Sequence, residues 1–224
     1  MRITRRTAPA AQSSRKRALL RLGGMLSALV LVAAAAYWAA PRAMGRAAGG
    51  AAGRDLPAEG PIYVAEIPAG TILTREQFER VVFPIERDEE EWRELLGEGA
   101  YAVLRERKTE RAFSGRYDRH YEDGIYYSAA TGQPLFSSET KYDSRTGWPS
   151  YYEPIEPGAV LYVEDYSLIL KQIEIVDSKS GSHLGHVFDD GPEPTGRRYC
   201  INSAALVFAP EGGKPPEIGA AAAR

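Results

Sequence analysis

The sequence predicts a mainly β fold with a few helices, preceded by an N-terminal membrane helix. From residue 124 onward, short apolar runs alternate with Gly, Pro, Asp and Ser, which is typical of short strands in an antiparallel sheet or barrel. Few stretches have helical periodicity, and the aromatic residues concentrate after position 90. The 224 residues are enough for one mid-sized domain with extensions.

The membrane helix is predicted from the first 40 residues. Residues 1–21 hold seven Lys or Arg and no acidic residue, and residues 22–40 are uncharged and mostly apolar. About 20 such residues cross a bilayer as a helix, and the basic flank places residues 1–21 in the cytoplasm. The length of the run favours a signal anchor, whereas its Ala-rich end leaves a cleaved signal peptide open. The folded domain is therefore expected in the cell envelope, either membrane-anchored outside the cytoplasm or secreted or periplasmic after cleavage.

Two short segments are predicted to separate this helix from the main domain. Residues 41–60 are mostly Ala, Gly and Arg and are predicted to form a flexible linker. Residues 61–85 are predicted to form a packing arm, with a strand at 62–64. In this arm, Thr74 followed by Gln77 is a capping box that starts a short helix.

The main domain is predicted to span residues 86–209. Its helix runs over 88–96, with Asp88 as N-cap and acidic residues in the first turn. Its strands are predicted at 125–127, 160–163, 168–176, 186–188 and 204–208. Residues 210–224 are rich in Pro, Gly and Ala and are predicted to be disordered.

Charge and cysteine content exclude several functions. A formal net charge of -2 gives no overall attraction to nucleic acid. The chain contains one cysteine, which excludes an internal disulfide and every zinc site built on two or more thiolates.

That cysteine, Cys200, is the candidate nucleophile. The alternation around it is that of a strand, which puts Arg198, Cys200 and Asn202 on one face. A cation and an amide beside a thiol favour the thiolate and stabilise developing charge. The alternative is a buried structural cysteine, because free cysteine is among the most buried residue types.

Several motifs around Cys200 resemble the B type of peptide methionine sulfoxide reductase (MsrB). They are Gly-Trp-Pro-Ser at 147–150, His-Leu-Gly-His-Val-Phe-Asp-Asp-Gly-Pro at 183–192 and Arg-Tyr-Cys-Ile-Asn-Ser-Ala-Ala-Leu at 198–206. Shorter matches at 109–110, 113–115, 134–138 and 141–144 follow the family's order and spacing. The resemblance implies two antiparallel sheets in a barrel-like arrangement with a few peripheral helices. It also implies reduction of the R epimer of methionine sulfoxide, with Cys200 becoming a sulfenic acid.

The resemblance assigns a role to each site residue. Trp148 is expected to hold the substrate methyl group, although a core tryptophan is the alternative. His186 is expected to hydrogen-bond or protonate the sulfoxide oxygen, and His183 to orient the site. Asn202 is expected to position the oxygen or a water, and Arg198 to favour the thiolate. His183 and His186 have the spacing of metal ligands, but no further soft ligand accompanies them, so no metal is expected.

The chain departs from the family at two cysteine sites. Many members hold a structural zinc on two Cys-x-x-Cys pairs, and the matching positions here are Ser128, Thr131, Asp177 and Ser180. Thr146 stands where many members have a resolving cysteine. The expected enzyme therefore has no cofactor and depends on an external thiol, either a small thiol or a thioredoxin-like or glutaredoxin-like protein.

The expected substrate is oxidised protein, with the membrane as a second partner through the N-terminal helix. Two alternatives stay open at this point. One is a module that binds oxidised methionine without efficient turnover, and the other is a different thiol enzyme such as a cysteine peptidase.

Overall fold

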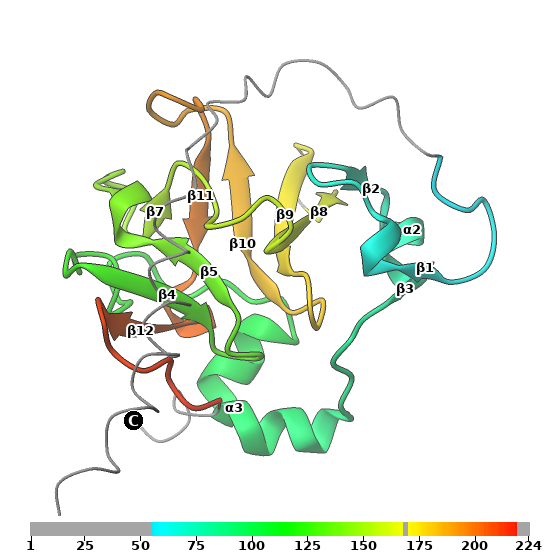
Figure 1. Cartoon of the computed structure of the whole chain (residues 1–224), viewed down its shortest axis with the longest axis horizontal. Helices are drawn as coiled ribbons and strands as arrows, with labels where there is room; N and C mark the ends of the chain where they lie inside the picture. Colours follow the sequence, from blue (N-terminus) through cyan, green and yellow to red (C-terminus); the bar gives the residue numbers. More distant parts are fainter. Residues whose placement is uncertain (1–54, 168–169, 219–224) are drawn as a thin grey trace, which may run out of the picture. The chain divides into compact units, whose positions relative to one another are not determined.

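Two sheets, each almost entirely antiparallel, form the centre of the fold (Figure 1). A computed structural model of the chain describes residues 55–167 and 170–218. The larger sheet has the order β2-β8-β9-β10-β11-β7-β6. Its strands are β2 (Ile72–Leu73), β6 (Lys141–Tyr142), β7 (Ser150–Tyr151), β8 (Val160–Asp165), β9 (Gln172–Asp177), β10 (His183–Phe188) and β11 (Arg198–Ile201). The smaller sheet has the order β12-β4-β5, from β4 (Gly124–Ser128), β5 (Pro134–Ser137) and β12 (Leu206–Pro210).

The larger sheet is open, so the predicted barrel-like closure is wrong. Its outermost strands in the described part of the chain are β2 and β6, and these do not pair with each other. Each has only two residues, which is too short for the continuous ladder that closes a barrel. Short edge strands also limit unwanted pairing with other chains. The prediction of a mainly β fold is confirmed.

Aromatic side chains fill the core between the sheets. Tyr126 of β4, Phe136 of β5 and Tyr151 of β7 are fully buried. The rings of Phe136 and Tyr151 stack at 4.4 Å between centroids, and Tyr126 meets Tyr151 edge-on at 5.3 Å. Such pairs stabilise a core beyond the area that they bury.

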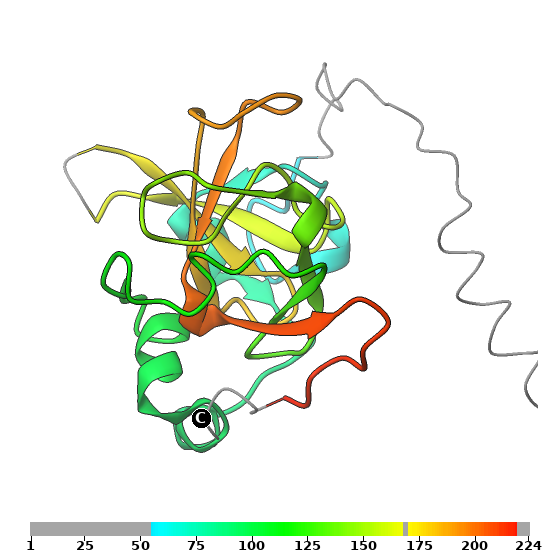
Figure 2. The same ribbon diagram turned by 90° about the vertical axis from the view of Figure 1, so that its left-hand side faces the viewer.

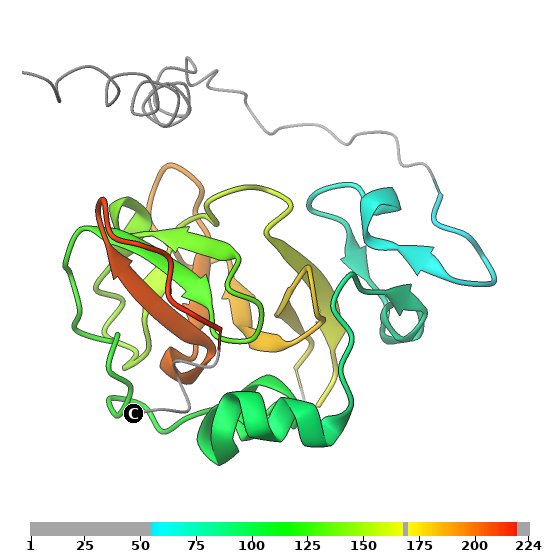
Figure 3. The ribbon, with the colours of Figure 1, turned by 60° about the horizontal axis from the view of Figure 1, so that its bottom comes forward.

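Helix α3 (Glu89–Leu104) covers one end of this core (Figures 2 and 3). Asp88 caps it as predicted, because its carboxylate accepts from the Glu91 backbone N–H at 2.8 Å. The helix is eight residues longer than predicted and passes through Gly97, whose φ of 68° kinks it. The second half has its own apolar face, in which Leu104 is buried, and it contacts the turn after β11.

The segment 61–85 packs against the edge of the larger sheet beside β8 (Figure 1). It contains β1 (Ile62–Tyr63), β3 (Val81–Val82) and α2 (Arg75–Glu79), and β2 joins β8 in parallel. The predicted capping box at Thr74 and Gln77 is present and starts α2. The arm's Ile62, Leu73 and Val81 form a second apolar cluster with Leu161, Val163 and Val176.

Single turns of 3-10 helix lie at η1 (Val64–Glu66), η2 (Ser138–Thr140) and η3 (Ser203–Ala205).

The predicted cytoplasmic segment 1–21 and membrane helix 22–40 lie outside the described residues, as does most of the linker. Within 55–167 and 170–218, no helix combines the length and the apolar character needed to cross a bilayer.

Candidate active site

A β-bulge in β10 brings the two predicted histidines to one face of the larger sheet. His183 pairs with Val176 and Gly185 with Ile175, so Leu184 is an extra residue in the ladder. In a regular strand, residues three apart point to opposite faces. Here the rings of His183 and His186 lie 5.4 Å apart. Gly185 is required at this point because a Cβ there would collide with the carbonyl oxygen of Cys200.

Cys200 lies directly across the ladder from His186. β10 and β11 pair these two residues, and on its other side Cys200 pairs with Ser150 of β7. Residues that face each other across an antiparallel ladder point to the same side of the sheet. The predicted alternation is confirmed within β11, since Tyr199 and Ile201 are buried while Arg198 and Cys200 are partly exposed. Asn202, predicted on the same face as Cys200, lies beyond β11 and is buried.

Burial raises the pKa of the Cys200 thiol above its usual value, and this effect prevails over two opposing ones. The charge of Arg198 and a hydrogen bond from Thr146 both lower the pKa. Arg198 is also paired with Asp190, with both N···O distances at 2.8 Å. Arg198 therefore lowers the pKa of Cys200, the direction expected of a cation. Because burial prevails, Cys200 at rest is a protonated thiol that needs a base to remove its proton.

Two buried carboxylates hold the two histidines. Asp165 of β8 accepts from His186 Nε2 at 2.9 Å, and Glu174 of β9 accepts from His183 Nδ1 at 2.7 Å. Burial raises the pKa of each carboxyl, but opposing contacts hold both pKa values at about 2. For Asp165 these are hydrogen bonds from His186 and Ser167 and the charge of Arg107. For Glu174 they are hydrogen bonds from His183 and Arg75 and the charge of Arg107. Burial also lowers the pKa of His186. His186 is therefore a neutral, oriented imidazole at neutral pH.

The sequence analysis did not identify Asp165 or Glu174. The pattern that could have identified them is an acidic residue within a mostly apolar strand. Asp165 ends Val-Leu-Tyr-Val-Glu-Asp, and Glu174 lies in Gln-Ile-Glu-Ile-Val-Asp. A buried acid must have a partner, and two histidines were available for pairing.

Asn202 and Trp148 are joined to the site through Glu110. Asn202 donates to the carbonyl of Leu184 at 3.0 Å and accepts from the Glu110 N–H at 3.1 Å. Trp148 donates its indole N–H to the Glu110 carbonyl at 3.1 Å and remains partly exposed. The carboxylate of Glu110 accepts from the backbone N–H groups of Ser203 and Ala204, just beyond Cys200. These bonds fix the turn after β11 against the loop before β7.

The four positions that match the family's zinc cysteines meet around Asp177. Its carboxylate accepts from Thr131 and Gln133, each at 2.7 Å, and hydrogen-bonds Ser128. The backbone N–H of Ser180 lies 3.4 Å from the Asp177 carbonyl oxygen. Hydroxyl groups and an already engaged carboxylate do not form the soft donor set of a structural zinc site. Hydrogen bonds therefore join the two loops where the family often uses a metal.

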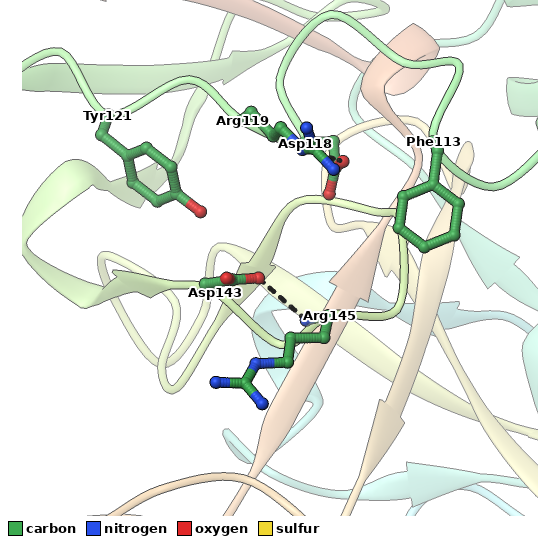
Figure 4. A pocket seen from close by; sticks show the side chains of 6 residues that line it. All are labelled: Phe113, Asp118, Arg119, Tyr121, Asp143 and Arg145. Carbon is green, nitrogen blue, oxygen red and sulfur yellow. Dashed lines mark hydrogen bonds and ion pairs between the residues drawn. The ribbon is translucent and has the colours of Figure 1, made fainter.

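A cavity of about 410 Å³ lies beside the loop that leads to Trp148 (Figure 4). It is lined by Phe113, Asp118, Arg119, Tyr121, Asp143 and Arg145. None of the six predicted site residues lines it. It adjoins the site through the loop itself, because Arg145 precedes Thr146, which hydrogen-bonds Cys200.

Comparisons with known proteins identify the family of this chain. Residues 96–210, just over half of the chain, match the family model described as the SelR domain. The "Peptide methionine sulfoxide reductase MsrB" of Methanosarcina mazei is 56% identical over 127 residues, which cover 57% of this chain and 91% of the relative. That of Leptospira interrogans is 47% identical over 129 residues, 58% of this chain and 98% of the relative.

A eukaryotic relative matches as well. The mouse "Methionine-R-sulfoxide reductase B3, mitochondrial" is 44% identical over 144 residues, which cover 64% of this chain and 55% of the relative. The chain therefore belongs to the SelR-domain family, the family of the MsrB methionine sulfoxide reductases.

Proposed function

We propose that this protein reduces the R epimer of methionine sulfoxide in oxidised proteins, with Cys200 as the nucleophile. The supporting observation is the ladder position of Cys200 opposite His186, whose Nε2 is engaged by Asp165, in a member of the MsrB family. The bond to Asp165 leaves Nδ1 as the ring nitrogen for proton transfer.

The chemistry is a two-electron transfer between two sulfur atoms. Neutral His186 takes the proton of the Cys200 thiol, and the thiolate sulfur attacks the sulfoxide. This attack forms a sulfur–sulfur bond, the imidazolium returns that proton to the sulfoxide oxygen, and the sulfur–oxygen bond of the substrate breaks. The hydroxyl group then bonds to the Cys200 sulfur, the sulfur–sulfur bond breaks, and methionine leaves. The oxygen ends on Cys200 as a sulfenic acid. Cys200 is oxidised by two electrons, and the substrate sulfur is reduced by two.

The remaining site residues would hold the substrate. The partly exposed indole of Trp148 offers an apolar surface for the substrate methyl group. His183, buried and bonded to Glu174, would orient the site, and its Nε2 has no hydrogen-bond partner among the described residues. Asn202, fixed by two backbone bonds, would support the oxygen or a water beside Cys200.

Regeneration requires a thiol from outside the chain. Two external thiol groups convert the sulfenic acid first into a mixed disulfide and water, and then into free Cys200 and an external disulfide. A thioredoxin-like or glutaredoxin-like protein would supply them, and no metal cofactor takes part. The sequence of residues 22–40 supports action in the cell envelope with a membrane anchor, or in the periplasm if that segment is removed.

Epimer-resolved turnover tests this proposal. The purified full chain, with dithiothreitol as reductant, is expected to convert the R epimer of a dabsylated methionine sulfoxide to methionine. The S epimer is expected to stay unchanged, and Cys200→Ser is expected to lose all turnover because the attacking sulfur is gone. Activity retained in Cys200→Ser, or equal activity on both epimers, would refute the proposal.

A further inference from the structure

The carboxylate of Glu174 is held by a cation that comes from outside the family domain. The Glu174 side chain is 1% exposed, and both of its oxygens are engaged. Oε1 accepts from His183 at 2.7 Å and from Arg107 Nε at 2.9 Å. Oε2 accepts from Arg107 Nη2 at 2.7 Å and from Arg75 Nη2 at 2.6 Å. Arg75 is the one of these partners that lies outside the matched residues 96–210.

The packing arm holds Arg75 in place. Arg75 opens α2, which starts at the Thr74 capping box and packs beside β8. Its guanidinium also lies over the ring of Phe78, 5.2 Å from the centroid. Its side chain is 31% exposed, so it is largely withdrawn from water. A charged bond to a buried carboxylate under these conditions is stronger than an exposed surface pair.

Arg75 also balances the charge around the histidines. The groups that face them are Asp165 of β8, Glu174 of β9, Arg75 of α2 and Arg107 after α3. Besides bonding Glu174, Arg107 places its Nη2 3.6 Å from Asp165 Oδ1. Two cations thus match two carboxylates beside the neutral imidazole of His186. Loss of Arg75 leaves one excess negative charge, which favours the imidazolium form of His186.

We propose that Arg75 is a positioning residue for sulfoxide reduction, which acts through Glu174 on the orientation of His183 and the protonation of His186. The proposal rests on the function proposed above. It means that the packing arm is part of the reductase and not only a cover for the sheet edge.

Three variants of the full chain test this role. Arg75→Gln is expected to lower kcat about tenfold, as slight misplacement of a reacting group does. It is also expected to move the acid limb of the pH profile of kcat/KM to higher pH, because neutral His186 is the base. Arg75→Lys keeps the charge and is expected to restore the wild-type profile. Arg80→Gln is the matched control, since Arg80 lies in the same arm but bonds only the carbonyls of Pro57 and Gly60.

Nitrogen-15 NMR of the imidazoles provides a readout that does not depend on turnover. Wild type is expected to show His183 with its proton on Nδ1, and Arg75→Gln to show a mixture of tautomers. An unshifted pH profile, an equal change in Arg80→Gln, no rescue by Arg75→Lys, or an unchanged tautomer in Arg75→Gln would each overturn the assignment of Arg75. Inactivity of the wild-type chain would instead contradict the proposed function and leave the NMR test of Arg75 in force.

Discussion

Opposing effects act on the pKa of the Cys200 thiol, and in the proposed mechanism their balance requires a base, the role assigned to His186 across the ladder. Burial raises the pKa, Arg198 lowers it, and Asp190 raises it again. Because Arg198 is paired with Asp190, the negative charge of Asp190 offsets much of the effect of Arg198 on the pKa of Cys200. A thiol that stays protonated at rest is also protected from unwanted oxidation until a substrate arrives.

The Arg198–Asp190 pair is expected to tune this thiol in two directions. Asp190→Asn removes a negative charge and is expected to speed alkylation of Cys200 by iodoacetamide about threefold at pH 7.5, the size of effect expected from a partly exposed charge. Arg198→Gln removes the opposing positive charge and is expected to slow alkylation by a similar factor. The rate is measured by mass spectrometry over a series of pH values. A change in the same direction for both variants would show that access to the sulfur, not charge, controls the rate.

At the scale of elements, the loop before β7 joins Cys200 to the rest of the site. Thr146 hydrogen-bonds Cys200 and shares a second bond with Ser144 at 2.8 Å. Arg145 has a φ of 61° and Gly147 one of 91°, so the loop turns sharply on both sides of Thr146. The N–H of Phe113 donates to the Gly147 carbonyl at 2.8 Å and holds the loop from outside. Thr146, at the position where the resemblance implies a resolving cysteine in many members, therefore already contacts Cys200.

Thr146→Cys is accordingly expected to create an internal disulfide with Cys200. After one equivalent of methionine-R-sulfoxide, this variant should lose both titratable thiols and release one water, because the new thiol attacks the sulfenic acid. Wild type and the matched control Thr146→Ser should instead show a sulfenic acid by mass spectrometry. If Thr146→Cys keeps a free thiol beside a sulfenic acid, the two side chains do not meet in solution.

The elements themselves were predictable only where the pattern is local. Capping residues correctly placed the starts of α2 and α3, and the alternation around Cys200 correctly described β11. The second half of α3 was missed because Gly97, which takes a non-helical φ of 68°, and Gly99 interrupt the helical pattern. The bulge at Leu184 was not predictable, because it depends on the register with β9 and β11 and not on the residues of β10 alone.

At the scale of the whole molecule, the site depends on pairings between distant segments. Asp165 and Glu174 bond the histidines, and Arg75 and Arg107 bond Glu174. These four residues come from separate segments of the chain. No local pattern links residues 99 positions apart, as Arg75 and Glu174 are. The predicted barrel failed for the same reason, since closure depends on how the edges of the sheet end. The residues around Cys200 and the resemblance supplied the candidate nucleophile and the histidines, but not the buried ion pairs that support the histidines.

These buried ion pairs are expected to couple the stability of the whole domain to acid. The folded-state pKa of Glu174 is about 2, against an ordinary value of 4.5. Its contribution to the free energy of unfolding is therefore complete above pH 4.5 and is lost as the pH falls toward 2. The shift corresponds to about 3 kcal/mol. Urea unfolding at pH 5.5, 4.5, 3.5 and 2.5 is expected to show a steep loss in the wild-type chain.

Glu174→Gln isolates this carboxyl from the others that titrate over the same range. The variant is expected to be less stable at pH 5.5, because two arginines lose their buried partner. Its stability should then fall less steeply with acid, so that the two curves converge by about 3 kcal/mol near pH 2. Glu98→Gln changes an exposed acid on α3 and should follow the wild-type curve. Parallel curves for wild type and Glu174→Gln would mean that Glu174 titrates alike in the folded and unfolded chains, so that neither Arg75 nor Arg107 stabilises its charge.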